Sequence, residues 1–232
     1  MKSKTYKKIL FPINDYRKLL LGIFITFHTL LFTFHVQAAE RVDPLKAFLS
    51  GLETLKADFT QTLVNEDGNE LEKSTGVLYL QQPGEFHWSY QKPYMQQIIS
   101  NGELLWIYDE DLEQVTIRKI GDAIDQTPAG IILGNSHLEK YFVQVDLGKI
   151  EGFDWIELTP RDLDAQYKNI RFGFEKNRLG MMIIADNLGQ TTRIDFSKVE
   201  KNEKLQPDLF KFKIPENVDV IDERDVKENL DI

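Results

Sequence analysis

Between residues 75 and 114, short apolar segments rich in aromatic side chains alternate with sequences typical of turns. The breaks fall at residues 82–84, 91–93, 100–102 and 109–111. Each break contains Pro, Gly, Asn or Asp, the residue types that turns favour. Asn101 and Gly102 both tolerate the positive φ of a type I′ turn, which indicates a tight hairpin. The stretch therefore predicts four consecutive antiparallel strands.

The segment at residues 85–91 indicates what such strands present on each side. Alternation with a period of two places Phe86, Trp88 and Tyr90 on one face of the sheet, and polar residues such as His87 on the other, solvent-exposed face. The aromatic face must be covered, either by a permanent core or by a cover that a ligand can displace. The pattern alone leaves both alternatives open.

The rest of the chain predicts a single, mainly β (α+β) domain. A helix is expected from Asp43-Pro44 to about Leu55, because Asp43 can cap it and apolar residues recur every three or four positions. Two short helices are expected between residues 122 and 144. The further expected features are sheet segments from Trp155 to Phe196 with turns at 176–178 and 187–189, a last apolar segment at 209–214, and a short edge strand from Val218.

The amino terminus has the features of a secretory signal peptide. Residues 1–18 are basic, residues 19–34 are apolar, and Val36 and Ala38 are small residues suited to cleavage after Ala38. The alternative is an uncleaved membrane anchor, but the apolar run is shorter than the roughly 20 residues that a spanning helix needs. We therefore expect an exported domain of residues 39–232.

Charge and cysteine content narrow the function classes. The chain has 37 acidic and 28 basic residues, and several of the basic residues lie in the leader. An acidic domain is repelled by nucleic-acid phosphates and anionic lipid surfaces, so neither is expected as a partner. The chain has no cysteine, which excludes disulfides, thiolate metal sites and a lipid anchor on cysteine.

Catalytic chemistry finds little support in the sequence. Outside the leader only His87 and His137 remain, and neither is near an obvious carboxylate in the sequence. No metal or cofactor motif is present. Asp109 and Asp111 form the core of an acidic cluster at an expected hairpin tip, where carboxylates are usually just solvated. A hydrolase that uses either aspartate remains an alternative to a binding protein.

A resemblance emerges from motifs in a fixed order along the exported part of the chain. They are Phe59-x-Gln61, Gly76-x-Leu78, Pro83-Gly84-x-Phe86-x-Trp88, Pro93, Asn101-Gly102-x-x-Leu105-Trp106-x-Tyr108, Glu113-Gln114-Val115-Thr116 and Thr127-Pro128. In this order the chain resembles the LolA family of periplasmic carriers of outer-membrane lipoproteins.

The resemblance implies an unclosed antiparallel half-barrel whose concave apolar face is covered by a lid of short helices. It implies a non-enzymatic periplasmic carrier without a cofactor, expected to be a monomer, that binds the acyl chains of lipoproteins. The implied partners are acylated lipoproteins, an inner-membrane ABC-type lipoprotein-releasing complex and an outer-membrane lipoprotein receptor of similar fold. The alternative is an exported lipid- or glycolipid-binding half-barrel with another cargo.

On these grounds the sequence nominates residues for the acyl-chain cavity. Phe86, Trp88 and Tyr90 are expected on its floor, and Trp106 and Tyr108 join them if the hairpin register allows. The expected lid residues are Leu49, Leu52, Ile124, Ile131, Ile132, Leu138 and Phe142.

Gln82 occupies the position where members of the family carry an arginine that holds the lid closed. An amide can still donate to a carbonyl, but it lacks the charge and the donor fork of a guanidinium. The sequence therefore predicts a weaker latch and a more open empty protein.

Overall fold

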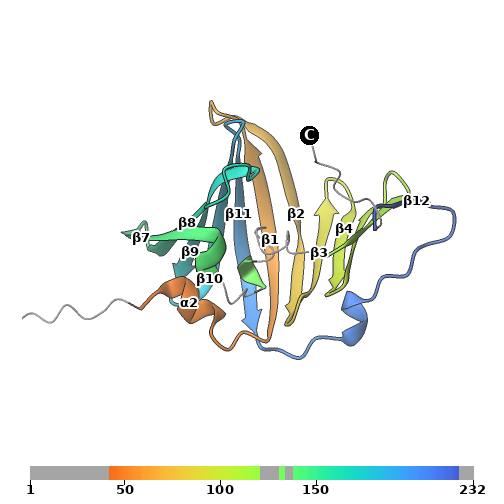
Figure 1. Cartoon of the computed structure of the whole chain (residues 1–232), viewed down its shortest axis with the longest axis horizontal. Helices are drawn as coiled ribbons and strands as arrows, with labels where there is room; N and C mark the ends of the chain where they lie inside the picture. The colour runs from red at the N-terminus through yellow and green to blue at the C-terminus, as the bar shows by residue number, and fades with distance from the viewer. Residues whose placement is uncertain (1–41, 121–130, 134–137, 225–232) are drawn as a thin grey trace, which may run out of the picture. The chain divides into compact units, whose positions relative to one another are not determined.

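The computed structural model describes residues 42–120, 131–133 and 138–224, and these form one twelve-stranded sheet (Figure 1). The first six strands are β1 (Thr54–Val64), β2 (Glu70–Gln81), β3 (Glu85–Lys92), β4 (Gln96–Asn101), β5 (Leu104–Asp109) and β6 (Gln114–Lys119). The others are β7 (Phe142–Ile150), β8 (Phe153–Pro160), β9 (Tyr167–Glu175), β10 (Arg178–Asp186), β11 (Thr191–Lys201) and β12 (Asp219–Asp222). Within the described residues, the helices are α2 (Pro44–Leu49), α4 (Leu138–Tyr141) and the 3₁₀ turn η2 (Pro207–Phe210).

The strand order explains why the chain must cross both faces of the sheet. The order is β12-β6-β5-β4-β3-β2-β1-β11-β10-β9-β8-β7, so two meanders meet where β1 pairs with β11. Strands β6 and β7 lie near opposite edges, and the connection between them contains residues 131–133 and α4. A second connection leads from β11, in the middle of the sheet, to β12 at its edge.

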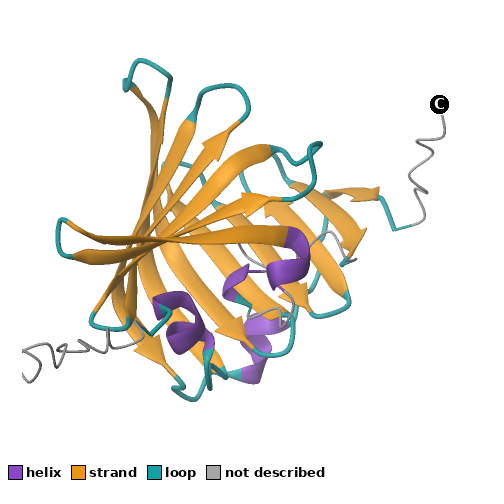
Figure 2. Cartoon of the chain, turned by 60° about the vertical axis from the view of Figure 1, so that its left-hand side comes forward, coloured by secondary structure: helices purple, strands orange, loops and turns teal. Residues whose placement is uncertain are grey.

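The sheet curves strongly and does not close (Figure 2), which confirms the predicted half-barrel. It is mixed rather than purely antiparallel, because β12 pairs with β6 in parallel. That strand fulfils the predicted edge strand near Val218. Among the described residues, no helix is both long enough and apolar enough to span a bilayer.

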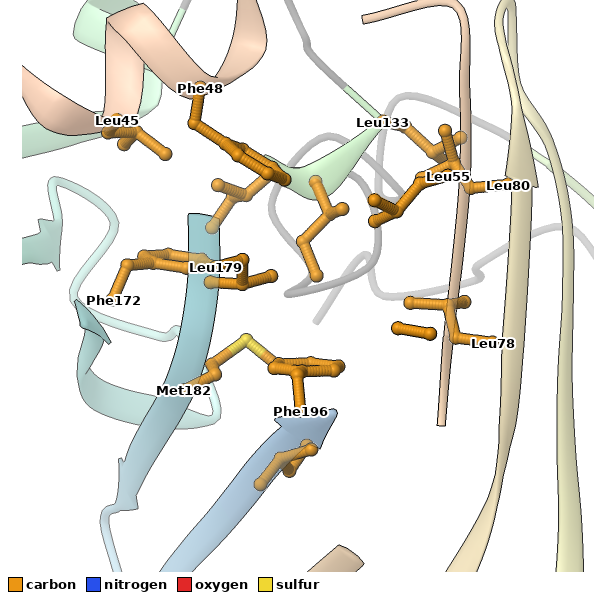
Figure 3. Packing of buried hydrophobic residues seen from close by; sticks show 14 of the residues in the cluster. Leu45, Phe48, Leu55, Leu78, Leu80, Leu133, Phe172, Leu179, Met182 and Phe196 are labelled. Carbon is orange, nitrogen blue, oxygen red and sulfur yellow. The ribbon is translucent and has the colours of Figure 1, made fainter. Parts of the chain in front are cut away.

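The main core fills the concave face of the sheet. Alternate residues of β1, Leu55, Ala57 and Phe59, are buried there, as the period of two requires. Residues of α2 and the described lid residues 131–133 belong to the same cluster. Figure 3 shows Leu133 close to Leu55 and Leu80.

A smaller core lies on the opposite, convex face. It is covered by the C-terminal strap, which we define as residues 205–214 and which includes η2. Its η2 turn contacts β3 and β4, and Phe210 is fully buried. The strap connects β11, in the middle of the sheet, to β12, which pairs with β6 at the edge.

Two predicted helix ends were wrong. The first helix ends at Leu49 instead of near Leu55, because Ser50 is extended and Gly51 adopts a positive φ of 65°. The helix expected to reach residue 144 gives way at Phe142 to β7, a strand that the sequence analysis missed.

The β4–β5 hairpin forms as predicted, but its turn is not type I′. Gly102 has a positive φ of 88°, while Asn101 is absent from the residues with positive φ. The Asn101 Oδ1 instead accepts hydrogen bonds from the backbone N–H groups of Glu103 (3.0 Å) and Leu104 (2.9 Å). The side chain therefore closes the turn by an Asx-type contact. In the β9–β10 hairpin, by contrast, Lys176 and Asn177 both have positive φ.

Candidate functional site

The predicted floor residues of β3 lie together on the concave face. Phe86 pairs with Leu80, Trp88 with Leu78 and Tyr90 with Gly76, so the register places all three rings on one side. Phe86 is 3% exposed and Trp88 is 7% exposed. They form an apolar, largely aromatic surface in the bend of the sheet.

Phe59 completes this aromatic cluster, and the sequence analysis did not include it among the cavity residues. Its ring centroid lies 5.2 Å from that of Trp88 and 5.2 Å from that of Tyr90, and the Trp88 and Tyr90 rings stack at 6.5 Å. Such geometries are favourable for aromatic pairs. The signal that could have identified Phe59 is its alternation with Leu55 and Ala57 in β1.

Gly76 makes room for this arrangement. A Cβ atom on Gly76 would lie 1.9 Å from the Ser89 carbonyl oxygen and 2.7 Å from the Phe59 ring. The Phe59 ring therefore lies against the backbone of β2, where any other residue would collide with it. The absence of a side chain at Gly76 is what positions Phe59 on the floor.

Tyr90 contributes an apolar ring to the floor, and its hydroxyl group has a hydrogen-bond partner. Its hydroxyl donates to the Gln61 Oε1 at 3.1 Å. Burial raises the Tyr90 pKa to about 12, an effect that the contact with the Gln61 side-chain amide opposes and the nearby Glu72 carboxylate reinforces. The hydroxyl therefore stays protonated, and the floor carries no charge there.

Trp106 and Tyr108 do not join the floor. Trp106 pairs with Ile99, and Tyr108 pairs with Gln97, which places both rings on the convex face; Ile107 lies on the Trp88 side. The ring centroid of Phe212, in the C-terminal strap, lies 6.0 Å from that of Trp106 and 5.6 Å from that of Tyr108. Their inclusion in the cavity was wrong, because the register across the β4–β5 hairpin fixes the opposite parity.

The lid segment, defined as the described residues 131–133, covers the floor. Ile131, Ile132 and Leu133 are 0%, 2% and 7% exposed and belong to the concave core. The gap that remains between the lid and the sheet is too narrow to hold a water molecule. Its walls are Leu78, Leu80, Phe86, Trp88 and Ile132. The lid and floor thus meet almost completely, and a chain-like ligand must displace the lid.

The other predicted lid residues occupy different places. Leu49, Leu138 and Phe142 line a half-open groove between α2, α4 and β7, while Leu52 is buried in the concave core. Phe142 is the first residue of β7 and not part of a helix. Ile124 lies outside the described residues.

Gln82 reaches the lid segment. Its Nε2 donates a hydrogen bond to the carbonyl oxygen of Leu133, and its own backbone N–H donates to the carbonyl of Glu53 at 2.8 Å. The second bond fixes the backbone of Gln82 at the start of β1. The side chain therefore extends from an anchored position and holds the lid at one point.

Among the described residues, those considered for catalysis form no catalytic arrangement. Asp109 and Asp111 accept hydrogen bonds from the backbone N–H groups of Leu112 (3.2 Å) and Met95 (3.3 Å), so both carboxylates cap turns. Within the described ranges no group of three His, Asp or Glu side chains is placed to hold a metal ion. His137 lies outside the described residues.

His87 is less exposed than its alternation suggests. It lies on the convex face beside Tyr79 and beneath the strap, and neither ring nitrogen has a hydrogen bond of good geometry among the described residues. Burial lowers the His87 pKa, and this effect is partly offset by the backbone of Leu209 and the side chain of Gln97. The expectation of a solvent-exposed His87 was wrong because a remote part of the chain covers it.

Comparison with known proteins shows which family the chain belongs to. Residues 50–213 match the family model described as outer membrane lipoprotein carrier protein LolA. An outer-membrane lipoprotein carrier protein of Dechloromonas aromatica is 40% identical over 185 residues, covering 80% of this chain and 89% of that protein. One of Methylococcus capsulatus is 43% identical over 180 residues, covering 78% and 86%.

A solved structure shares the fold at low sequence identity. It is an uncharacterized conserved protein from Thermus thermophilus, with a TM-score of 0.50 and 13% identity, covering 78% of this chain and 95% of that one.

Proposed function

The chain belongs to the LolA family of outer-membrane lipoprotein carriers, and from that premise we propose that it shields the acyl chains of lipoproteins on the concave face of its sheet. The family is periplasmic and transports without catalysis. This chain is therefore a lipoprotein carrier. The steps proposed below concern how its own residues bind and release the cargo.

The observation that carries the proposal is an apolar floor closed by a lid whose Leu133 carbonyl accepts a side-chain hydrogen bond from Gln82. Removing one methylene of an acyl chain from water contributes about 0.8 kcal/mol. A carrier therefore needs an apolar surface, but it must also release the chains. The lid residues Ile131 and Ile132 cover the floor in the empty protein and compete with cargo for it.

This competition makes loose binding a consequence of the fold. Cargo that displaces Ile131, Ile132 and Leu133 exposes side chains whose burial contributes about 1.5–3 kcal/mol each. The free energy of lid closure is thus subtracted from that of cargo binding. The carrier holds the acyl chains strongly enough to shield them and weakly enough to pass them on.

Membership of the family supports a proposal for the route of the cargo. We propose that the signal peptide is cleaved after Ala38 and that the exported domain acts as a monomer. It receives acylated lipoproteins from an inner-membrane ABC-type complex and passes them to an outer-membrane receptor of similar fold. The acidic composition of the chain fits a protein that stays free of anionic lipid surfaces.

Native mass spectrometry of residues 39–232 tests the proposal. The domain is mixed with a triacylated lipoprotein and, separately, with the same protein lacking its acyl chains. We expect a one-to-one complex with the acylated form alone. Binding of free lipids or glycolipids without binding of the acylated protein would instead indicate a half-barrel with another cargo.

A further inference from the structure

Trp88 lies at the centre of the floor, in contact with the gap under the lid. It is 7% exposed, its ring neighbours are Phe59 and Tyr90, and it lines the narrow gap together with Ile132. A side chain in this place meets any ligand that replaces the lid.

The indole N–H of Trp88 is buried and has no hydrogen-bond partner among the described residues. A buried donor without an acceptor is unfavourable, and native cores rarely keep one without a reason. Among the described residues, the two His87 ring nitrogens and the Tyr167 hydroxyl are also buried without a partner, but other aromatic donors are satisfied. The Trp155 Nε1 donates to the Ile150 carbonyl at 3.2 Å, and the Tyr90 hydroxyl on the same floor donates to Gln61.

The surroundings of Trp88 define what kind of acceptor can reach it. The other walls of the gap are Leu78, Leu80, Phe86 and Ile132, all apolar. A charged or strongly hydrated acceptor would lose its hydration in such a place. An acceptor that enters as part of a hydrocarbon chain does not have this disadvantage. The carbonyl of an acyl group is an acceptor of this kind.

Building on the carrier function proposed above, we propose that the Trp88 Nε1–H recognises the ester or amide carbonyl that joins an acyl chain to its cargo. The aromatic floor supplies nonspecific apolar contact, whereas this donor supplies chemical selectivity. The floor then distinguishes acylated cargo from hydrocarbon of the same length. In the empty protein the donor is left unpaired beneath the lid, which favours exchange of the lid for cargo.

The test compares two synthetic lipopeptides with the same peptide and the same chain lengths. One carries a diacylglyceryl group with ester-linked chains, and the other carries the dialkyl ether, which lacks both carbonyls. We expect the domain to bind the ester about tenfold more tightly, which corresponds to about 1.4 kcal/mol. Trp88→Phe, which keeps an aromatic ring but removes the N–H, should reduce this ratio to near one.

Trp106→Phe is the matched control. It makes the same substitution on the convex face, where the ring contacts Phe212, and should leave the ester-to-ether ratio unchanged. The ratio cancels any general loss of apolar contact at residue 88, since the two lipopeptides share their hydrocarbon chains.

A second measurement uses the unaltered protein and does not depend on the folding of a variant. The chain has three tryptophans, so ¹⁵N labelling gives three indole signals in solution NMR. We expect the Trp88 indole proton to shift downfield with the ester lipopeptide and much less with the ether. Equal affinity for both lipopeptides with no ester-specific shift would overturn the inference and leave the carrier function standing. Failure to bind either lipopeptide would overturn both.

Discussion

Replacing Gln82 by leucine removes the hydrogen bond that its Nε2 donates to the Leu133 carbonyl, while keeping a side chain of similar size. A hydrogen bond between neutral groups contributes about 1 kcal/mol net, and an unpaired buried carbonyl adds to the loss. Since 1.4 kcal/mol corresponds to a factor of ten, lid opening should become about fivefold more frequent or more. The apolar contacts of Ile131 and Ile132 remain, so the lid is loosened but not lost.

Hydrogen–deuterium exchange of the backbone amides of residues 131–133 measures this change. In the Gln82→Leu protein their exchange should accelerate by about the same factor, while exchange in β10 stays as before. Gln81→Leu is the control, because the Gln81 Nε2 donates to the Glu85 Oε2 at 2.6 Å and not to the lid. It should leave the lid amides unchanged.

Gln82→Arg tests the same reasoning in the opposite direction. A bond from a charged donor contributes about 1.5–3 kcal/mol, so exchange at the lid should slow severalfold. Because the closed lid competes with cargo, release of cargo should become severalfold faster. If neither Gln82→Leu nor Gln82→Arg altered lid exchange or cargo release, the idea that this side chain latches the lid would be refuted.

Three further predictions concern the frame around the site. Gly76→Ala should lower the free energy of unfolding by about 1–3 kcal/mol and the melting temperature by about 2–4 °C per kcal/mol in thermal denaturation, because the new Cβ collides with the Ser89 carbonyl; an unchanged melting temperature would contradict this packing. Burial lowers the His87 pKa, so at low pH the unfolded chain binds a proton at His87 more readily than the folded protein does. The stability that comes from burying a neutral His87 is therefore present above about pH 6.5 and is lost as the pH falls below that value. Urea denaturation should therefore show that the free energy of unfolding falls less between pH 8 and pH 5 in His87→Phe than in the natural protein. Equal decreases in the two proteins would argue against a buried His87. Phe210→Ala should cost about 3–5 kcal/mol of stability yet leave cargo binding in native mass spectrometry intact, since Phe210 lies under the strap on the convex face; loss of binding by a folded variant would contradict that placement.

The side-chain placements that the sequence predicted correctly depend on local periodicity. Phe86, Trp88 and Tyr90 belong to one strand, and alternation within a strand fixes which side chains share a face. The half-barrel with short helices likewise follows from successive strands and turns, together with the resemblance to a family. Gln82 was found from its position in a motif, and the structure brings its side chain to the lid.

The errors arise where distant parts of the chain decide the outcome. The face of Trp106 depends on the turn that joins β4 to β5, and a shift of one residue moves every side chain to the other face. His87 is covered by the C-terminal strap, which no pattern near residue 87 reveals. Strand β7 was missed because it lies at an edge, where Val143 and Val145 remain largely exposed and give no clear core pattern.

Photo-crosslinking from opposite faces of the sheet tests most directly whether cargo replaces the lid on the concave floor. The photoreactive residue p-benzoyl-phenylalanine is placed at Tyr90, on the floor, or at Tyr108, which lies two strands away on the convex face. With a triacylated lipoprotein, irradiation should crosslink cargo from position 90 and not from position 108. Crosslinking from position 108 alone, or equally from both positions, would contradict the concave floor as the binding surface.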